Sequence, residues 1–176
     1  NEIITIEALS LRVNREIKLT NILFEGNKNI LLPGIEQVVQ NLTKQFLINK
    51  NHCFEIQGHV NGAGSPATYA CAYMDLSKAR AGRVYFMMAD KGINTERMIP
   101  VGYAHLKMLY PTNPSAQQMQ QNRRVVVKIL DCNKVKDMKT DFNESVFSKL
   151  TNDTIYSDPE VLGIITKDTY CFAVAG

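Results

Sequence analysis

The sequence lacks a dense run of lysine and arginine, and no basic stretch is interleaved with aromatic residues. The net charge of its 176 residues is only +3 at pH 7. Because nucleic-acid-binding proteins carry clustered positive charge for the phosphates, nucleic acid is not expected as a partner. The sequence also has no apolar run of bilayer length, so the domain itself is not expected to span a membrane.

The first ten residues, NEIITIEALS, lack the basic and apolar regions of a signal peptide. We therefore interpret the chain as a cytosolic protein, a mature chain or an excised piece of a longer protein. Its length and its hydrophobic content of 45% suffice for one domain with a core, with or without an appendage.

No C-x-x-C pair occurs among the four cysteines, Cys53, Cys71, Cys132 and Cys171. Their pairing stays open at this point: they are buried free thiols, or one disulfide forms, with Cys53–Cys71 as the candidate. A metal site that uses His52, Cys53, His59 and Cys71 matches no zinc spacing. No metal and no cofactor are therefore expected.

Hydrophobic periodicity predicts alternating strands and helices. The predicted strands are 3–13, 19–26, 53–60, 96–104 and 124–130, the predicted helices are 33–48 and 75–92, and a short polar helix lies within 111–123. Pro33 marks one helix start, Asp75 or Thr68 caps the next helix, Gly92 ends it, and Ser115 caps the short helix. We expect an α+β fold with two helices on one face of a small mixed sheet.

The patterns of two strands predict their places in this sheet. Residues 124–130 are almost continuously apolar, which indicates an interior strand. Residues 53–60 alternate between apolar and polar, so the second face of the sheet is expected to be partly wet. The predicted parts are an extended segment or hairpin at 1–19, a domain at 20–130 and an extension at 131–176. Because the extension is polar and turn-rich before it becomes apolar, we expect irregular chain plus one or two strands there.

Arg80 shares one stripe of its predicted helix with Leu76, Val84 and Met87. Burying an arginine without a partner costs several kcal/mol, so Arg80 needs an anion or the solvent. A glycine-rich loop precedes the helix, and its amides and the helix dipole favour negative charge. Two readings stay open: a pocket for a ligand carboxylate, or an internal ion pair with Asp75, Glu55 or a loop acid. Arg83 is expected at the exposed edge.

Several linked motifs occur in order: a strand that ends in Gly58-His59, the helix start L-S-x-x-R-A, the turn G-I-x-x-x-R-M and the terminal N-R-R-V. Over about 20–130 this series resembles the OmpA C-terminal-like domain family. The family includes peptidoglycan-associated lipoproteins and flagellar-motor stator domains. The stretches HLKMLYP and GHVN are similar to those of Bacteroidetes-type envelope proteins.

The resemblance implies a βαβαβ-like OmpA C-terminal-like sandwich with extra strands at its N- and C-terminal ends. It also implies non-covalent binding of the peptide stem of peptidoglycan. In such domains a loop acid pairs with the ammonium of diaminopimelate, and the arginine of L-S-x-x-R pairs with its carboxylate. Arg80 matches that arginine, whereas Asn61 stands at the acid position and would face the amine without a charge. We expect binding at least about tenfold weaker as a result.

Further binding residues follow from the same resemblance and from the loop: Gly62, Ala63, Tyr73, Asp75, Asn122 and Arg123. Tyr73 replaces a frequent family asparagine, Asp75 is a candidate for the missing charge, and Asn122 with Arg123 fixes the last loop or contacts the ligand. The expected role is non-catalytic anchoring of an outer-membrane or envelope protein to the cell wall from the periplasm, with other envelope proteins as further partners.

Two other functions remain as alternatives. The first is a ligand-less domain of this family that acts in protein assembly, which Asn61, Tyr73 and the enlarged loop favour. The second is an enzyme that uses His59, Ser65 and Asp75 for nucleophilic hydrolysis. No G-x-S-x-G elbow supports this chemistry, so the protein is not expected to be an enzyme.

Overall fold

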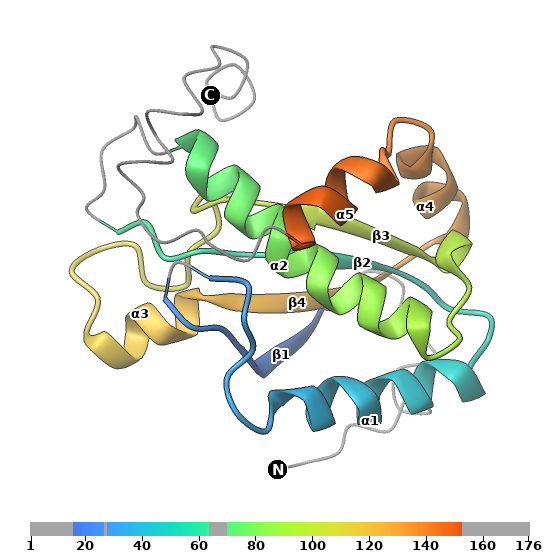
Figure 1. The fold of residues 1–176 in the computed structure, drawn as a ribbon, viewed down its shortest axis with the longest axis horizontal. Helices are drawn as coiled ribbons and strands as arrows, with labels where there is room; N and C mark the ends of the chain where they lie inside the picture. Colours follow the sequence, from blue (N-terminus) through green and yellow to red (C-terminus); the bar gives the residue numbers. More distant parts are fainter. Residues whose placement is uncertain (1–15, 27, 64–69, 153–176) are drawn as a thin grey trace.

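The computed structural model describes residues 16–26, 28–63 and 70–152 of the chain. Strands and helices alternate and are followed by two further helices (Figure 1). In chain order the elements are β1 Glu16–Leu23, α1 Ile35–Ile48, β2 Cys53–Gly58, α2 Ala70–Asp90, a 3-10 turn Thr95–Arg97, β3 Met98–Gly102, α3 Ala116–Asn122, β4 Arg124–Leu130, α4 Cys132–Lys139 and α5 Glu144–Asn152. No helix in these ranges is both long and apolar enough to cross a bilayer.

The strands form a four-stranded mixed sheet in the order β1-β4-β2-β3 within the described chain. The central strand β4 pairs antiparallel with both β1 and β2, which confirms the interior position predicted for 124–130. The edge strand β3 runs parallel to β2, with Ile56 opposite Pro100. The α+β fold class predicted from the sequence is confirmed.

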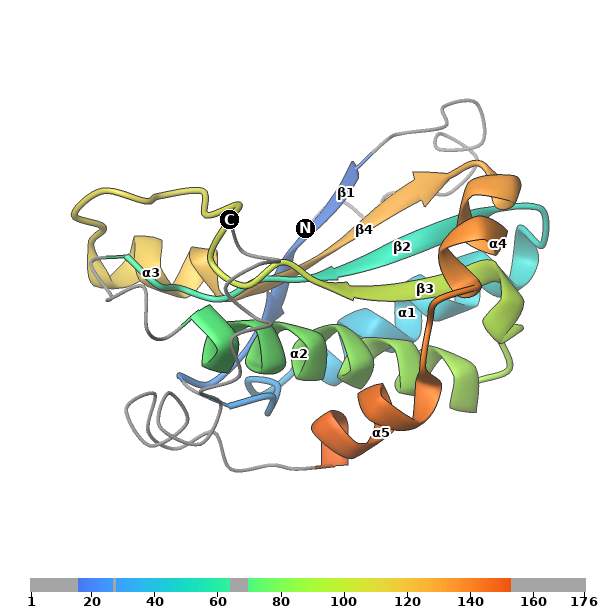
Figure 2. The same ribbon diagram turned by 90° about the horizontal axis from the view of Figure 1, so that it is seen from above.

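One face of the sheet forms the main hydrophobic core. Phe54 and Ile56 of β2 point into it because alternate residues of a strand face the same side. Figure 2 shows α1 and α2 covering this face, with α5 on the outer side of α2. The rings of Phe46 in α1 and Phe54 in β2 are stacked with their centroids 4.1 Å apart. The helix predicted at 33–48 thus packs against the sheet, as expected for helices on one face.

The second face of the sheet is more buried than its sequence pattern predicts. Glu55 and Gln57 of β2 are both buried, although the alternation predicts a wet face. The Tyr103 hydroxyl donates a hydrogen bond to the Glu55 carboxylate, which gives the buried acid a partner. At the other end of this face, Val135 of α4 packs with apolar residues of the three strands β2, β3 and β4. Helices α1 and α2 therefore cover one face, and α4 covers part of the other.

Strand β2 approaches α2 closely at Gly58. A Cβ on Gly58 would overlap the main-chain carbonyl of Ser77, so only glycine permits this contact. The glycine of the G-H motif therefore sets the distance between β2 and α2. This close packing places His59, directly after β2, next to the L-S-x-x-R turn of α2.

Three of the helix boundaries predicted from the sequence are confirmed, and one predicted cap is wrong. Gly92 ends α2 with a φ of 104°, Ser115 caps α3 through the Gln118 amide, and Pro33 immediately precedes the N-cap of α1. Helix α2, however, begins at Ala70, so Asp75 lies inside the helix and does not cap it. The alternative cap, Thr68, lies outside the described residues. Small residues such as Ala70 and Ala72 continue the helix upstream of the L-S-x-x-R motif.

Residues 131–152 contain two helices where we expected irregular chain. The Asp131 side chain accepts a hydrogen bond from the Asn133 amide and so caps α4. Helix α5 lies against α2, where Gly82 leaves room for Thr151. Short helices rich in Asp, Asn and Lys have weak intrinsic propensity and form through such caps and packing, which composition does not reveal. The strands predicted before residue 16 and after residue 152 lie outside the described residues.

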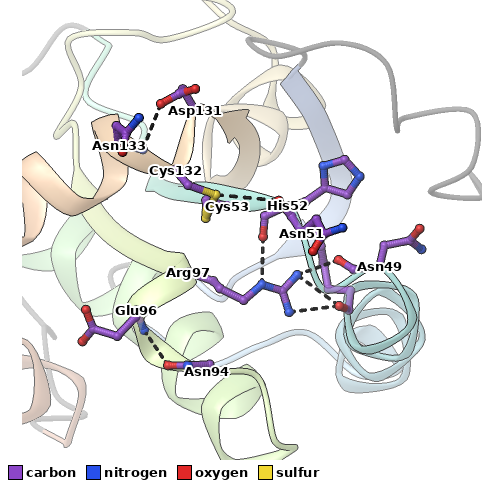
Figure 3. Close-up of a disulfide and its surroundings, with 11 residues drawn as sticks. Asn49, Asn51, His52, Cys53, Asn94, Glu96, Arg97, Asp131, Cys132 and Asn133 are labelled. Carbon is purple, nitrogen blue, oxygen red and sulfur yellow. Dashed lines mark hydrogen bonds between the residues drawn. A yellow bond between two sulfur atoms is a disulfide. The ribbon is translucent and has the colours of Figure 1, made fainter.

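A disulfide joins Cys53 at the start of β2 to Cys132 at the start of α4 (Figure 3). The Cα atoms are 5.1 Å apart, although 79 positions separate the residues in sequence. This pairing corrects both expectations for Cys53, which is neither a free thiol nor bonded to Cys71. It also removes Cys53 from the metal site considered above. The Cys71 side chain and Cys171 lie outside the described residues.

Candidate functional site

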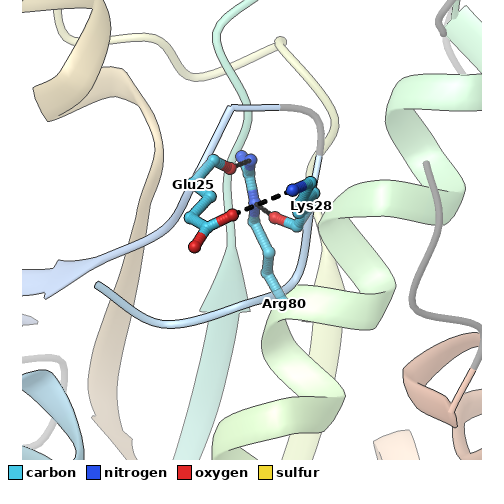
Figure 4. A network of polar contacts seen from close by, with 3 residues as sticks. All are labelled: Glu25, Lys28 and Arg80. Carbon is cyan, nitrogen blue, oxygen red and sulfur yellow. Dashed lines mark hydrogen bonds and ion pairs between the residues drawn. The ribbon is translucent and has the colours of Figure 1, made fainter. Parts of the chain in front are cut away.

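Arg80 points from α2 into the loop that follows β1 (Figure 4). Its Nε donates to the Lys28 carbonyl at 3.1 Å, Nη1 to the His59 carbonyl at 3.0 Å and Nη2 to the Glu25 carbonyl at 3.2 Å. The guanidinium also lies over the Phe24 ring, with 5.2 Å between Cζ and the ring centroid. Only 1% of Arg80 is exposed. The side chain therefore ties α2 to two separate parts of the chain.

The partners of Arg80 match neither of the two interpretations of the sequence, the ligand-carboxylate pocket and the internal ion pair. No carboxylate of the described residues forms an ion pair with Arg80, so the internal pair with Asp75 or Glu55 is not observed. Glu25 contributes its main-chain carbonyl, and its carboxylate pairs with Lys28 at 3.1 Å. Burial, together with the nearby charge of Arg123, lowers the pKa of Arg80 to about 9. A buried guanidinium that meets carbonyl dipoles but no acid remains attractive to an anion.

Asn61 lies in the chain just after β2 and is half-buried. Its Oδ1 accepts a hydrogen bond from Asn122 Nδ2 at 2.8 Å. Asn122 is completely buried and also bonds both the amide and the carbonyl of Tyr110. Asn122 therefore fixes the last loop, and the Asn61 oxygen expected to face a ligand amine faces Asn122 instead.

The neighbours of Asn61 are packed beneath residues 104–110. The Gly62 amide donates to Met108 Sδ at 3.3 Å, and a Cβ on Gly62 would come within 2.7 Å of His105 Cβ. The Tyr73 ring meets the His105 ring edge-on at 5.2 Å, and Tyr73 is 6% exposed. Tyr73 and Gly62 thus hold the loop against this segment. Ala63 is half-buried at the last described position before residue 70.

Arg123 and Asp75 take up different positions relative to this loop. Arg123 follows Asn122, and its Nη1 donates to Gln120 Oε1 at 3.3 Å. Asp75 lies in α2, and the structure places no hydrogen bond or ion pair between it and Asn61 or Arg80. Burial raises the pKa of Asp75, against the opposing effect of Lys78. The structure thus brings together Arg80, Asn61, Gly62, Tyr73, Asn122 and Arg123 at one end of the sheet, and Asp75 makes no described contact with them.

A family model for OmpA matches residues 23–123, which is more than half of the chain and includes this whole end of the sheet. The chain belongs to the OmpA family. A search of curated proteins finds no significant match.

Several solved structures share the fold of this OmpA-family domain. The periplasmic domain of Helicobacter pylori MotB (residues 78–256) is 19% identical, with a TM-score of 0.53, over 73% of this chain and 85% of that one. The OmpA-like domain of FopA1 from Francisella tularensis is 17% identical, with a TM-score of 0.54, over 61% and 68%. The cell wall anchor of the T6SS from Pseudomonas aeruginosa is 20% identical, with a TM-score of 0.51, over 65% and 78%. At these identities the likeness establishes the fold alone.

The segment 103–110 also belongs to this candidate site in the OmpA-family domain, although no pattern in the sequence predicted it. Lys107 lies with its Nζ 4.2 Å from the centroid of the Tyr103 ring, and its carbonyl accepts from Arg124 Nη2 at 2.9 Å. His105 and Met108 pack on Gly62 and Tyr73, as described above. No periodic pattern marks such a loop, because its place depends on contacts with residues far away in sequence. The stretch HLKMLYP in this segment indicated only a similarity to other envelope proteins.

A separate apolar cleft of about 380 Å³ lies beside the edge strand β3, at the junction with α4 and α5. It includes Ile99 and Val101 of β3 and Phe147 of α5. None of its lining residues belongs to the loop with Asn61, so the cleft is not part of the site above. Ser65 of the hydrolase alternative lies outside the described residues.

His59 is buried and neutral in the OmpA-family domain. Its Nε2 lies 3.3 Å from Gln57 Oε1, which can only accept, so Nε2 carries the proton and the buried Nδ1 has no partner in the described chain. Its ring stacks on Tyr103 with 5.5 Å between centroids. Burial, with Arg124 and Lys107 nearby, lowers the pKa of His59 to about 3 from 6.5. A neutral, enclosed imidazole of this kind is structural.

His59 should make the domain less stable in acid. Between pH 6.5 and about 3 the unfolded chain binds a proton at His59 that the folded chain does not. The free energy of unfolding therefore decreases as the pH is lowered through this range. The slope from this one group is at most about 1.4 kcal/mol per pH unit. Urea unfolding at pH 7, 6, 5 and 4 should show a shallower decline for His59→Gln than for the parent chain. Equal slopes for the two proteins would show that His59 is not the responsible group.

Proposed function

We propose that this OmpA-family domain binds the peptide stem of peptidoglycan without catalysing a reaction, and so anchors an outer-membrane or envelope protein to the cell wall. The observation that carries the proposal is the family match over residues 23–123, which contains Arg80 and the loop after β2 at one end of the sheet. One solved structure with this fold is itself described as a cell wall anchor.

The disulfide supports a location in the cell envelope. Disulfides such as Cys53–Cys132 persist in oxidising compartments and are rare in the cytosol. This favours the periplasm over the cytosol, with the outer membrane as the proposed attachment of the parent protein. Similarity to Bacteroidetes-type envelope proteins remains a prediction from the sequence.

The recognised residue is proposed to be diaminopimelate, through its terminal carboxylate. Arg80 is the proposed partner of that carboxylate, and Arg123 adds positive charge nearby. Three carbonyls occupy Arg80 in the structure, so direct contact requires the Glu25–Lys28 turn to open. The cost of those hydrogen bonds reduces the affinity. Weak binding that depends on many wall sites is therefore expected.

Co-sedimentation with purified sacculi of the diaminopimelate type tests the proposal. The domain should pellet with the sacculi and should be released by an excess of soluble muropeptide. Arg123→Ala should reduce the pelleted fraction, because it removes a partly buried charge near Arg80, whereas Arg83→Ala makes the same change on the exposed side of α2 and should have no effect. Absence of the domain from the pellet at any sacculus concentration would overturn the proposal.

A second function, in protein assembly without a ligand, is favoured by one observation. Arg80 is 1% exposed and each of its three nitrogens already donates to a main-chain carbonyl, and Asn61 supplies no charge for an amine. Such a domain would not pellet with sacculi but would form a defined oligomer or a complex with another envelope protein. Light scattering of the purified chain, run beside the sedimentation assay, separates the two functions.

A further inference from the structure

The orientation of the Asn61 side chain follows from a chain of hydrogen bonds. The amide of Tyr110 can only donate and its carbonyl can only accept, so together they fix Asn122 with Oδ1 toward the amide and Nδ2 toward the carbonyl. The same Nδ2 also donates to Asn61. The Asn61 atom that receives this bond must therefore be its oxygen.

The free end of Asn61 is consequently a donor. Its Nδ2 carries two N–H groups, and no residue of the described ranges accepts from them. Asn61 is half-buried, so part of the residue is exposed beside these N–H groups. An ammonium has only donors and cannot bond to this atom, whereas a carboxylate or a carbonyl can.

The charges around Asn61 also favour an anionic ligand group over a cationic one. Arg123 and Arg124 directly follow Asn122 in sequence, and Arg124 bonds the carbonyl of Lys107. Besides burial, the charge of Arg123 lowers the pKa of Arg80, and the charges of Arg124 and Lys107 lower the pKa of His59, so positive charge acts on this end of the sheet. This end of the sheet therefore repels a cation and attracts an anion.

We infer that the loop after β2 selects a hydrogen-bond acceptor through Asn61, so that the domain recognises the carboxylate end of the stem residue and does not require its amine. The inference rests on the proposed wall binding and specifies its ligand class. A site that bonds both charges of a zwitterion rejects an N-acylated stem residue, whereas this site tolerates it.

The chain offers a matched variant. Asn61→Asp keeps an oxygen that accepts from Asn122 Nδ2, so the loop retains its internal bond, and it converts the outward donor into a charged acceptor. Asn61→Ala removes both groups and reports the contribution of the whole side chain.

Calorimetric titration with three muropeptide fragments tests the inference. One fragment contains diaminopimelate, the second contains diaminopimelate with its terminal amine acetylated, and the third contains lysine, which has the amine without the carboxylate. The parent chain should bind the first two with Kd values within threefold of each other and the lysine fragment about tenfold more weakly. Asn61→Asp should bind the free-amine fragment at least tenfold more tightly than the acetylated one.

The outcomes separate the inference from the proposed function. Loss of affinity of threefold or more on acetylation, equal binding of the lysine fragment, or no gain of amine preference in Asn61→Asp would each overturn the inference alone. Binding to none of the fragments, with no sedimentation on sacculi, would overturn the proposed function as well. Circular dichroism of both variants establishes that they are folded before titration.

Discussion

Replacing Arg80 with alanine is expected to lower the free energy of unfolding by about 4 kcal/mol. Arg80 is among the largest fully buried side chains of the described residues. Its removal leaves the carbonyls of Lys28 and His59 without their Arg80 donor, while the Glu25 carbonyl keeps the hydrogen bond from the Lys28 amide at 3.3 Å. Each buried carbonyl that loses a partner costs about 1–3 kcal/mol, and a cavity forms beside Phe24. Equilibrium unfolding in urea at neutral pH measures the difference.

Arg83→Ala is the matched control for this measurement. Arg83 lies one turn further along α2 and is exposed, so its loss should change stability by less than about 0.5 kcal/mol. Arg80→Lys keeps the charge but cannot bond three separated carbonyls with one ammonium, so it should fall between the parent and the alanine variant. If Arg80→Ala is as stable as Arg83→Ala, the side chain does not tie α2 to the Glu25–Lys28 turn.

The stability of the Arg80 variants determines how their binding assays can be interpreted. An arginine that holds the fold together abolishes binding when it is removed, whether or not it touches the ligand. Substitutions at Asn61 and Arg123 do not share this problem, because both residues are only partly buried. They are the informative positions for ligand contact.

Removing the Cys53–Cys132 disulfide is expected to destabilise the domain by about 4 kcal/mol, or to lower its Tm by roughly 10 °C. The bond closes a long loop, with a sequence separation of 79, and such a loop restricts the unfolded chain strongly. It also fixes α4 to the start of β2, where Val135 packs on Ile99 and Leu130. Thermal unfolding of Cys53→Ala/Cys132→Ala against the oxidised parent measures the effect.

Reductant provides the control for the disulfide. The parent chain in a reducing buffer should unfold at about the temperature of the double alanine variant, and the variant itself should be insensitive to the reductant. Arg97 remains as a second link at this end, since it bonds the carbonyls of Phe46, Asn49 and His52 (Figure 3). A parent Tm that does not change on reduction would show that this link and the core suffice without the disulfide.

The elements with a strong period were predictable from the sequence. Residues 33–48 and 124–130 form a helix and an interior strand as expected, because an apolar stripe or a continuous apolar run specifies both the element and its buried side. The early start of α2 and the helices in 131–152 were missed. These segments owe their helical state to caps and to contacts with α2 and the sheet, which are not local properties.

The sequence indicated positions that, apart from Asp75, lie together in the structure, but it did not indicate their interactions. The L-S-x-x-R spacing indicated that Arg80 leans inward, but it did not reveal that main-chain carbonyls would meet it. The Asn61 side chain was named from its place in the loop, and its orientation depends on Asn122, which lies 61 positions away. Which atom donates and which accepts between residues so far apart in sequence is fixed only when the chain folds.

The sequence by itself determined the α+β class, the face that α1 buries, and the loop and arginine that mark the family. Those features follow from periodicity and spacing, which the chain carries locally. Only the tertiary structure decided which cysteine bonds Cys53, that Arg80 is enclosed, and that the Asn61 oxygen faces Asn122. Each of these depends on groups that folding brings together from distant positions in the sequence. No local pattern in the sequence specifies such contacts.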